Sequence, residues 1–243
     1  MKVSLICALA AFILAGNLCS ISAQTSAATQ PKAVDQEQHT IEKHTRPVLK
    51  ALKLDDAAKE AKVRDIVWDY TKALDAWHQQ NDAQIKALWK DFNQARSKKN
   101  EAIANLALEK IDGVYASFRP EHDRFLSELG TVLTPEQVET VKDVLTVKKV
   151  EVTYNAYQQI FHGLTDAQKA FILKNLKAAR EEAINAGSMN EKSAFFKKYK
   201  IKIEAYLTSQ GYDVKQSYRD FVAKQKAEAA AKKAAKAAAE DKK

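Results

Sequence analysis

The chain contains few of the residues that interrupt helices, and its cysteines are confined to one end. Its 243 residues include only six glycines and four prolines. The segments between them are rich in alanine, leucine, lysine, glutamate and glutamine, which favour helices. Both cysteines, Cys7 and Cys19, lie within the first 23 residues, so the remainder of the chain forms no disulfide. We expect an all-α fold, a bundle of amphipathic helices.

Common catalytic and cofactor motifs are also missing. The sequence has no Gly-x-Ser-x-Gly, no phosphate-binding loop and no dinucleotide fingerprint. No two histidines lie four residues apart, the spacing typical of a metal-binding helix. Carboxylates alternate with lysine and arginine at helical spacing, which is typical of a solvated helix face. We therefore predict a non-catalytic protein with no cofactor and no metal ion.

The N-terminus has the pattern of a secretory signal peptide. Lys2 supplies a positive charge, Val3–Gly16 is an uncharged apolar run, and Ala23 is the small residue expected beside a cleavage site. This predicts a signal peptide over residues 1–23 and a periplasmic or secreted protein. A lipid anchor at Cys19 is the alternative.

Composition divides the remaining chain into three parts. Residues 24–40 are rich in serine, threonine and alanine and predict a flexible leader, and residues 41–222 predict a helical domain. Residues 223–243 form a tail of lysine and alanine, which carries +4 of the formal net charge of +8. The tail predicts a solvated helical extension or an electrostatic tether to an envelope polymer or lipid headgroups. The domain itself is only weakly basic, so we expect no specific nucleic-acid binding.

Two apolar stripes predict a long helical hairpin. The first stripe, with steps of four and three, consists of Val63, Val67, Tyr70, Leu74, Trp77, Asn81, Gln84 and Leu88. Ile85, Trp89 and Phe92 widen it. The second stripe consists of Ile103, Leu106, Leu108, Ile111, Val114 and Phe118. The polar segment Arg96–Asn100 is expected to turn between them, and a single unbroken helix is the alternative.

Helix starts are marked by capping boxes, in which the side chain of the first residue accepts a hydrogen bond from the backbone N–H of the fourth residue. The four boxes are Thr134–Gln137, Thr165–Gln168, Ser188–Glu191 and Asp213–Gln216. One segment is ambiguous, because Val147–Tyr154 alternates valine with polar residues and is compatible with a short strand. With no partner strand evident, we favour a distorted helix.

Aromatic and basic residues toward the C-terminus predict a ligand-binding groove between helices. Flat aromatic faces stack on sugar rings, and an arginine donates planar pairs of hydrogen bonds. The ligand-binding candidates are Tyr154, Tyr157, Arg180, Tyr199, Tyr206 and Trp68. Packing in a helical core is the alternative role for each aromatic side chain.

The C-terminal half resembles an uncharacterised family of secreted bacterial helical proteins that is labelled sugar-binding. The segments that carry the resemblance are Val152–Tyr157, Ala178–Ala183, Phe196–Lys200 and Tyr206–Asp213. Weaker similarity extends back to about Leu52. The resemblance implies a carbohydrate or envelope polymer as partner, and the basic tail is an addition to the family pattern.

A second resemblance is to periplasmic chaperones that carry two Leu-Thr-x-x-Gln motifs. Here the motifs are Leu133–Gln137 and Leu164–Gln168, which are closer together than in that family and in the opposite order. This resemblance implies ATP-independent binding of unfolded protein clients. The sequence therefore predicts a carbohydrate-associated binding protein at the cell envelope, with a chaperone as the alternative, and it leaves the oligomeric state open.

Overall fold

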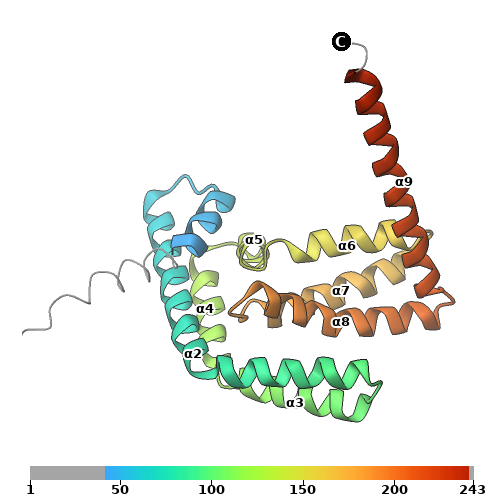
Figure 1. Cartoon of the computed structure of the whole chain (residues 1–243). Helices are drawn as coiled ribbons and strands as arrows, with labels where there is room; N and C mark the ends of the chain where they lie inside the picture. The colour runs from blue at the N-terminus through green and yellow to red at the C-terminus, as the bar shows by residue number, and fades with distance from the viewer. Residues whose placement is uncertain (1–41, 241–243) are drawn as a thin grey trace, which may run out of the picture. The chain divides into compact units, whose positions relative to one another are not determined.

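The computed structural model describes residues 42–240, with side chains as far as residue 233. The predicted signal peptide and leader, and the last three residues, lie outside this part. Within it the chain is helical and has no strand, which confirms the all-α prediction. Residues 42–52 form a first helix. The helices that follow (Figure 1) are α2 (Ala57–Ser97), α3 (Glu101–Ala116), α4 (Arg119–Val132), α5 (Pro135–Leu145), α6 (Lys149–Ile160), α7 (Asp166–Ala183), α8 (Met189–Ser209) and α9 (Val214–Glu240).

Helices α2 and α3 form the predicted antiparallel hairpin. The side chain of Asp56 begins α2 by accepting a hydrogen bond from the backbone N–H of Ala58 at 2.8 Å. Helix α2 ends at Ser97, and Asn100 begins α3 by accepting from the N–H of Ile103 at 3.2 Å. The two helices then pack along each other. The turn therefore lies where the polar segment predicted it.

The buried stripe of α2 follows the predicted positions only in its first half. Val63, Val67 and Tyr70 are buried as expected. Beyond Leu74 the stripe moves on by one residue, and the buried side chains are His78, Ile85, Trp89 and Phe92. Asn81, Gln84 and Leu88 of the predicted stripe are not buried, whereas Ile85, Trp89 and Phe92, which were predicted to widen it, are buried. The shift arises because an α-helix of 3.6 residues per turn drifts against a repeat of four and three.

Helix α2 is also bent (Figure 1). The side-chain amide of Asn81 donates to the backbone oxygen of Trp77 at 2.8 Å, inside the hydrogen-bond ladder of the helix. The bend lets one half of α2 pack against α4 and the other against α3.

Two of the four predicted capping boxes are complete. At Thr134–Gln137 and Thr165–Gln168 both reciprocal hydrogen bonds are present. At Ser188–Glu191 and Asp213–Gln216 only one of the two hydrogen bonds forms, from the backbone N–H of the fourth residue to the side chain of the first. The carboxylate of Glu191 is instead bonded to the N–H of Gly187 at 2.8 Å, so it is oriented toward the loop that precedes α8.

The ambiguous segment Val147–Tyr154 is helical from Lys149 onward. Its irregularity is confined to Val147 and Lys148, which have positive φ angles of 50° and 54°. These residues reverse the chain between α5 and α6. The helical interpretation is therefore confirmed, and the distortion precedes the helix rather than running through it.

The core has two parts that meet at Trp77. One lies between the first half of α2, the 42–52 helix, α4 and α5, and the other lies between the second half of α2 and helices α3, α6, α7 and α8. Trp77 packs partly against both. Helix α9 contacts α6 and α8 at its start, and from Val222 to Lys233 its side chains are exposed, as predicted for the tail. No helix in the described part of the chain is both long and apolar enough to cross a bilayer.

Candidate functional site

The connection between α7 and α8 carries a partly buried polar network, which we call the loop network. Its centre is Asn185, whose backbone oxygen lies 2.8 Å from Nε2 of His78. The Asn185 side-chain oxygen accepts from the hydroxyl of Tyr70 at 2.7 Å and lies 3.0 Å from Nδ1 of His122. Because these oxygens only accept, the contacts assign a hydrogen to Nε2 of His78 and to Nδ1 of His122. Three residues from α2 and α4 thus hold one loop residue.

A second part of the loop network joins α2 to the start of α8. Nδ1 of His78 lies 2.8 Å from Oδ1 of Asp82, one helical turn further along α2. Glu191 lies beside this pair, so that one ligand atom from each of the three side chains falls within 4.8 Å of the others. The Glu191 carboxylate is held from two sides, since it accepts from the hydroxyl of Tyr115 and from the N–H of Gly187. His78 and Glu191 are both buried.

Gly187 is required by close approach. A Cβ atom at this position would lie 2.8 Å from Cγ and Nδ1 of the His78 ring, closer than side chains can pack. The absence of a side chain therefore lets the loop backbone lie against the imidazole. This contact fixes the position of the ring relative to the start of α8.

Burial sets the protonation of the groups around the loop. Burial, with the nearby charge of Glu191, raises the pKa of Tyr115, so its hydroxyl keeps its proton and donates. Burial lowers the pKa of Lys192 to about 8. The Lys192 ammonium donates to the backbone oxygen of Ala186 at 2.8 Å, which adds another tie to the loop.

Two cavities open on either side of the bond between Tyr115 and Glu191. The first, of about 420 Å³, is bordered by Asp112, Tyr115, Arg119, His122, Asp123, Glu181, Glu182, Asn185 and Phe195. We call it the polar cavity, because acidic, basic and amide groups surround the ring of Tyr115. The second, of about 690 Å³, lies between α2 and α8, and Asp82 and Glu191 are part of its wall. We call it the α2–α8 cavity.

The structure places the predicted ligand-binding residues elsewhere. Arg180 is 2% exposed, and its guanidinium donates to carboxylates of its own chain: Asp143 at 2.7 Å, Glu139 at 2.7 Å and Glu181 at 3.0 Å. We call these four residues the Arg180 cluster. It ties α7 to α5, and none of its hydrogen bonds involves the predicted tyrosines.

The predicted aromatic residues mostly pack against neighbouring helices. Tyr157 is buried, Tyr206 stacks on Phe171 with ring centroids 3.9 Å apart, and the hydroxyl of Tyr199 donates to Glu182 at 2.6 Å. Tyr154 and Trp68 are half-buried, on α6 and α2. Neither the polar cavity nor the α2–α8 cavity is bordered by these five residues or by Arg180. Their role in ligand binding stays a prediction.

Sequence reasoning missed the loop network because it searched for pairs of histidines. The available signal was His78 and Asp82, which lie four residues apart on one helix. A second signal was Gly187, placed directly before the capping residue Ser188. Neither signal indicates that Asn185, 107 positions from His78, completes the arrangement.

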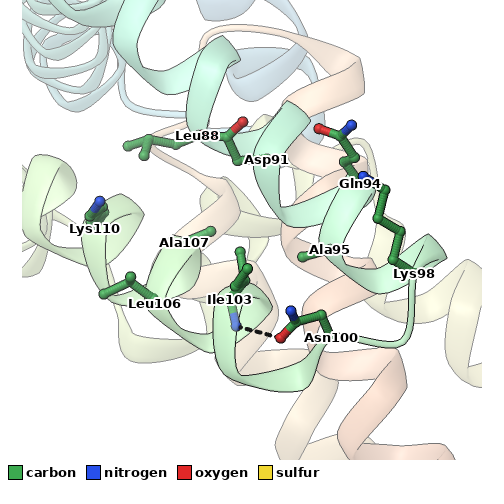
Figure 2. Close-up of a pocket in the computed structure, with 10 residues that line it drawn as sticks. All are labelled: Leu88, Asp91, Gln94, Ala95, Lys98, Asn100, Ile103, Leu106, Ala107 and Lys110. Atoms are coloured by element: carbon green, nitrogen blue, oxygen red, sulfur yellow. Dashed lines mark hydrogen bonds between the residues drawn. The ribbon is translucent and has the colours of Figure 1, made fainter.

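A third surface lies at the tip of the α2–α3 hairpin (Figure 2). It is a shallow depression of about 190 Å³ whose apolar side chains include Leu88, Ile103 and Leu106. Ile103 is 52% exposed and Leu106 is 49% exposed. We call this depression the hairpin surface. Its exposed apolar side chains are bordered by the charged residues Asp91, Lys98 and Lys110.

Comparison with known proteins identifies a family. The profile of a family described as "Protein of unknown function (DUF3826)" matches residues 38–227. That range covers the helical domain and the loop network. No curated protein matches the chain.

Proposed function

The chain belongs to this family of unknown function, and we propose that it is a non-catalytic binding protein, periplasmic or secreted, that binds carbohydrate at the cell envelope. The observation that carries the proposal is the polar cavity. Carbohydrates present hydroxyl groups that donate and accept, together with flat faces of C–H bonds. A binding site for them needs carboxylate or amide groups close to an aromatic ring.

Arg119 and Asp123 provide uncommitted polar groups. Both are exposed at the edge of the polar cavity, and neither forms a hydrogen bond or ion pair with the part of the chain that the structure describes. They lie four residues apart on α4, on the same side of the helix. A guanidinium and a carboxylate at this spacing suit adjacent hydroxyls of one sugar ring, the first as a donor and the second as an acceptor.

His122 and Tyr115 provide the ordered part of the cavity. Because Nδ1 of His122 donates to Asn185, its Nε2 is left as an acceptor for a hydroxyl group. Tyr115 is held in place by its bond to Glu191 and by edge-on contact with Phe195, whose ring centroid is 5.1 Å away. A half-buried aromatic ring fixed in this way offers a surface for stacking.

The proposal is tested with the chain lacking residues 1–23. A screen of neutral oligosaccharides identifies a ligand, and calorimetry then compares wild type with Asp123→Asn and Arg119→Met. We expect each substitution to weaken binding about tenfold, which corresponds to about 1.4 kcal/mol. Arg124→Met is the matched control, because Arg124 lies on the same helix and pairs with Glu121 and Glu128 instead. Absence of glycan binding, or equal binding by all variants, would contradict the proposal.

The hairpin surface supports the alternative, an ATP-independent chaperone for unfolded clients. Exposed apolar side chains in one depression are suited to extended apolar segments. If this alternative holds, wild type suppresses client aggregation at near-stoichiometric ratios, and replacing both Ile103 and Leu106 with glutamine abolishes the effect. Glycan binding without suppression of aggregation would support the carbohydrate proposal alone.

A further inference from the structure

The side chains of His78, Asp82 and Glu191 have the composition and spacing of a metal-ion site. One nitrogen and two carboxylate groups converge from two helices, and their ligand atoms lie within 4.8 Å of one another. The geometry points to a site for one divalent transition-metal ion, of which Zn²⁺ is the representative. This inference does not depend on carbohydrate binding, because it concerns the wall of the α2–α8 cavity.

Hydrogen bonding prepares His78 as a ligand. Its Nε2 carries the hydrogen that is donated to the backbone oxygen of Asn185 at 2.8 Å. In a neutral imidazole this leaves a lone pair on Nδ1, and that lone pair faces Oδ1 of Asp82 at 2.8 Å. Two acceptors at this distance need a cation or a proton between them. Metal-ligating histidines commonly donate their other N–H to a backbone carbonyl in this way.

The distances agree with shared coordination. Ligand atoms about 2.1 Å from one ion are about 3.0 Å apart at right angles, about 3.4 Å apart in a tetrahedral arrangement and about 4.2 Å apart when they lie opposite each other. The separation of 2.8 Å between His78 and Asp82 matches adjacent ligands. The three ligand atoms lie within 4.8 Å of one another, so we expect Glu191 to move toward the other two ligands when an ion binds.

The surroundings hold the three ligands in place. Glu191 is oriented by the hydroxyl of Tyr115 and the N–H of Gly187. The imidazole is fixed by the Gly187 backbone, which leaves no room for a Cβ atom. Such supporting contacts reduce the cost of ordering ligands when an ion binds.

The composition of the site selects the class of ion. An imidazole nitrogen favours Zn²⁺, Mn²⁺ or Fe²⁺ over Mg²⁺ and Ca²⁺, which prefer oxygen ligands. Asp82 and Glu191 also border the α2–α8 cavity, so the remaining coordination positions are open to water. Lys86 pairs with the other oxygen of Asp82 at 2.9 Å, but its side chain is 74% exposed and can move into solvent when an ion binds.

The test is titration of the tag-free chain with Zn²⁺, followed by calorimetry and by thermal unfolding. We expect one ion per chain, a rise in the melting temperature because the ion binds the folded state, and weaker binding of Mg²⁺. Asp82→Asn and Glu191→Gln keep the shape of each side chain and should each weaken Zn²⁺ binding at least about tenfold, since even supporting residues have effects of that size. Asp91→Asn, an exposed carboxylate on the same helix, should leave binding unchanged.

X-ray absorption of the Zn²⁺-loaded chain provides a second measurement. It should show one imidazole nitrogen among oxygen ligands, and that nitrogen should disappear in His78→Gln. If His78→Gln fails to fold, the two carboxylate variants still decide the question. The inference is overturned if Zn²⁺ does not bind, or if Asp82→Asn and Glu191→Gln bind it as tightly as wild type does. Either result leaves the carbohydrate proposal untouched.

Discussion

The Arg180 cluster and the loop network are both partly buried polar groups at the C-terminal end of α7, but they differ in how their charges are satisfied. In the Arg180 cluster one guanidinium donates to three carboxylates, and Lys142 adds a second cation 3.0 Å from Glu181. In the loop network Nδ1 of His78 lies 2.8 Å from a carboxylate oxygen of Asp82, and cavities open beside it. In the first arrangement each carboxylate lies within 3.0 Å of the guanidinium, although Nε of Arg180 has no hydrogen-bond partner in the described part of the chain. In the second arrangement Asp82 and Glu191 lie at the wall of a cavity.

This difference separates a structural role from a binding role. A buried guanidinium whose terminal nitrogens are paired with carboxylates of its own chain holds helices together and has little capacity left for a ligand. A preorganised set of hydrogen-bond acceptors beside a cavity can still bind a ligand or a metal ion. Arg180 has the residue type of a sugar-binding residue, and its observed contacts join α7 to α5. His78 belongs to no recognised sequence motif, but its contacts are those that the proposed metal-ion site requires.

The largest expected effect comes from removing the centre of the Arg180 cluster. Arg180→Ala removes the cation shared by three carboxylates, leaves Lys142 and Lys177 beside Glu139 and Glu181, and opens a cavity between α5 and α7. We expect the free energy of unfolding to fall by about 3 kcal/mol, at the lower end for a broken buried pair because the carboxylates are partly exposed. Urea unfolding followed by circular dichroism measures this. Ligand binding by the folded fraction should not change.

The control for this prediction is Arg124→Ala. Arg124 also pairs with two carboxylates, but all three side chains are exposed, so the loss should stay below about 1 kcal/mol. If Arg180→Ala is no more harmful than Arg124→Ala, or if it abolishes glycan binding while the fold is intact, the assignment of Arg180 to a structural role is wrong.

A smaller effect is expected from Gly187→Ala in the loop network. The added Cβ would lie 2.8 Å from the His78 ring, so either the ring or the loop must move. We expect destabilisation of about 1–3 kcal/mol and weaker Zn²⁺ binding, measured by urea unfolding and calorimetry.

Gly130→Ala in α4 is the matched control. A Cβ atom at Gly130 would have nothing within 4 Å, so this substitution should stabilise the helix by about 0.5–1 kcal/mol. Equal effects of both substitutions would contradict the close-approach argument.

Most of the fold could be predicted because its signals are local. Thr134 and Gln137 are three residues apart, and their reciprocal bonds follow from that spacing. The polar segment before Glu101 marked the turn of the hairpin for the same reason. Beyond Leu74 the sequence indicated Ile85, Trp89 and Phe92 only as a widening of the stripe, because the bend that makes them its centre depends on packing against α3 and α4.

The candidate site could be predicted much less well, because it depends on distant parts of the chain. Residue type alone indicated Arg180 as a ligand residue, since an arginine paired with carboxylates on α5 has the same sequence pattern as an unpaired arginine. His78 and Asp82 were visible as neighbours on one helix. Their partners Asn185 and Glu191 come from the far end of α7 and the start of α8, and only the packed fold brings them together.

The smallest expected effect is the pH dependence of the Arg180 cluster. Burial by itself raises the pKa of Glu139, but the hydrogen bond and charge of Arg180, with Lys142 and Lys177, outweigh it and hold the pKa below its usual value of 4.5. A carboxylate whose pKa is lower in the folded state stabilises the fold above the unfolded value, and this contribution is lost as the pH falls through the folded value. Between pH 7 and pH 3, wild type should therefore lose more stability than Glu139→Gln. The difference should be below about 1 kcal/mol, because the side chain is 39% exposed. Urea unfolding at both pH values measures it, with Glu109→Gln, an exposed glutamate of α3, as control. If Glu139→Gln and Glu109→Gln change the acid sensitivity equally, the charge of Glu139 is not coupled to Arg180, and the cluster is held together by packing alone.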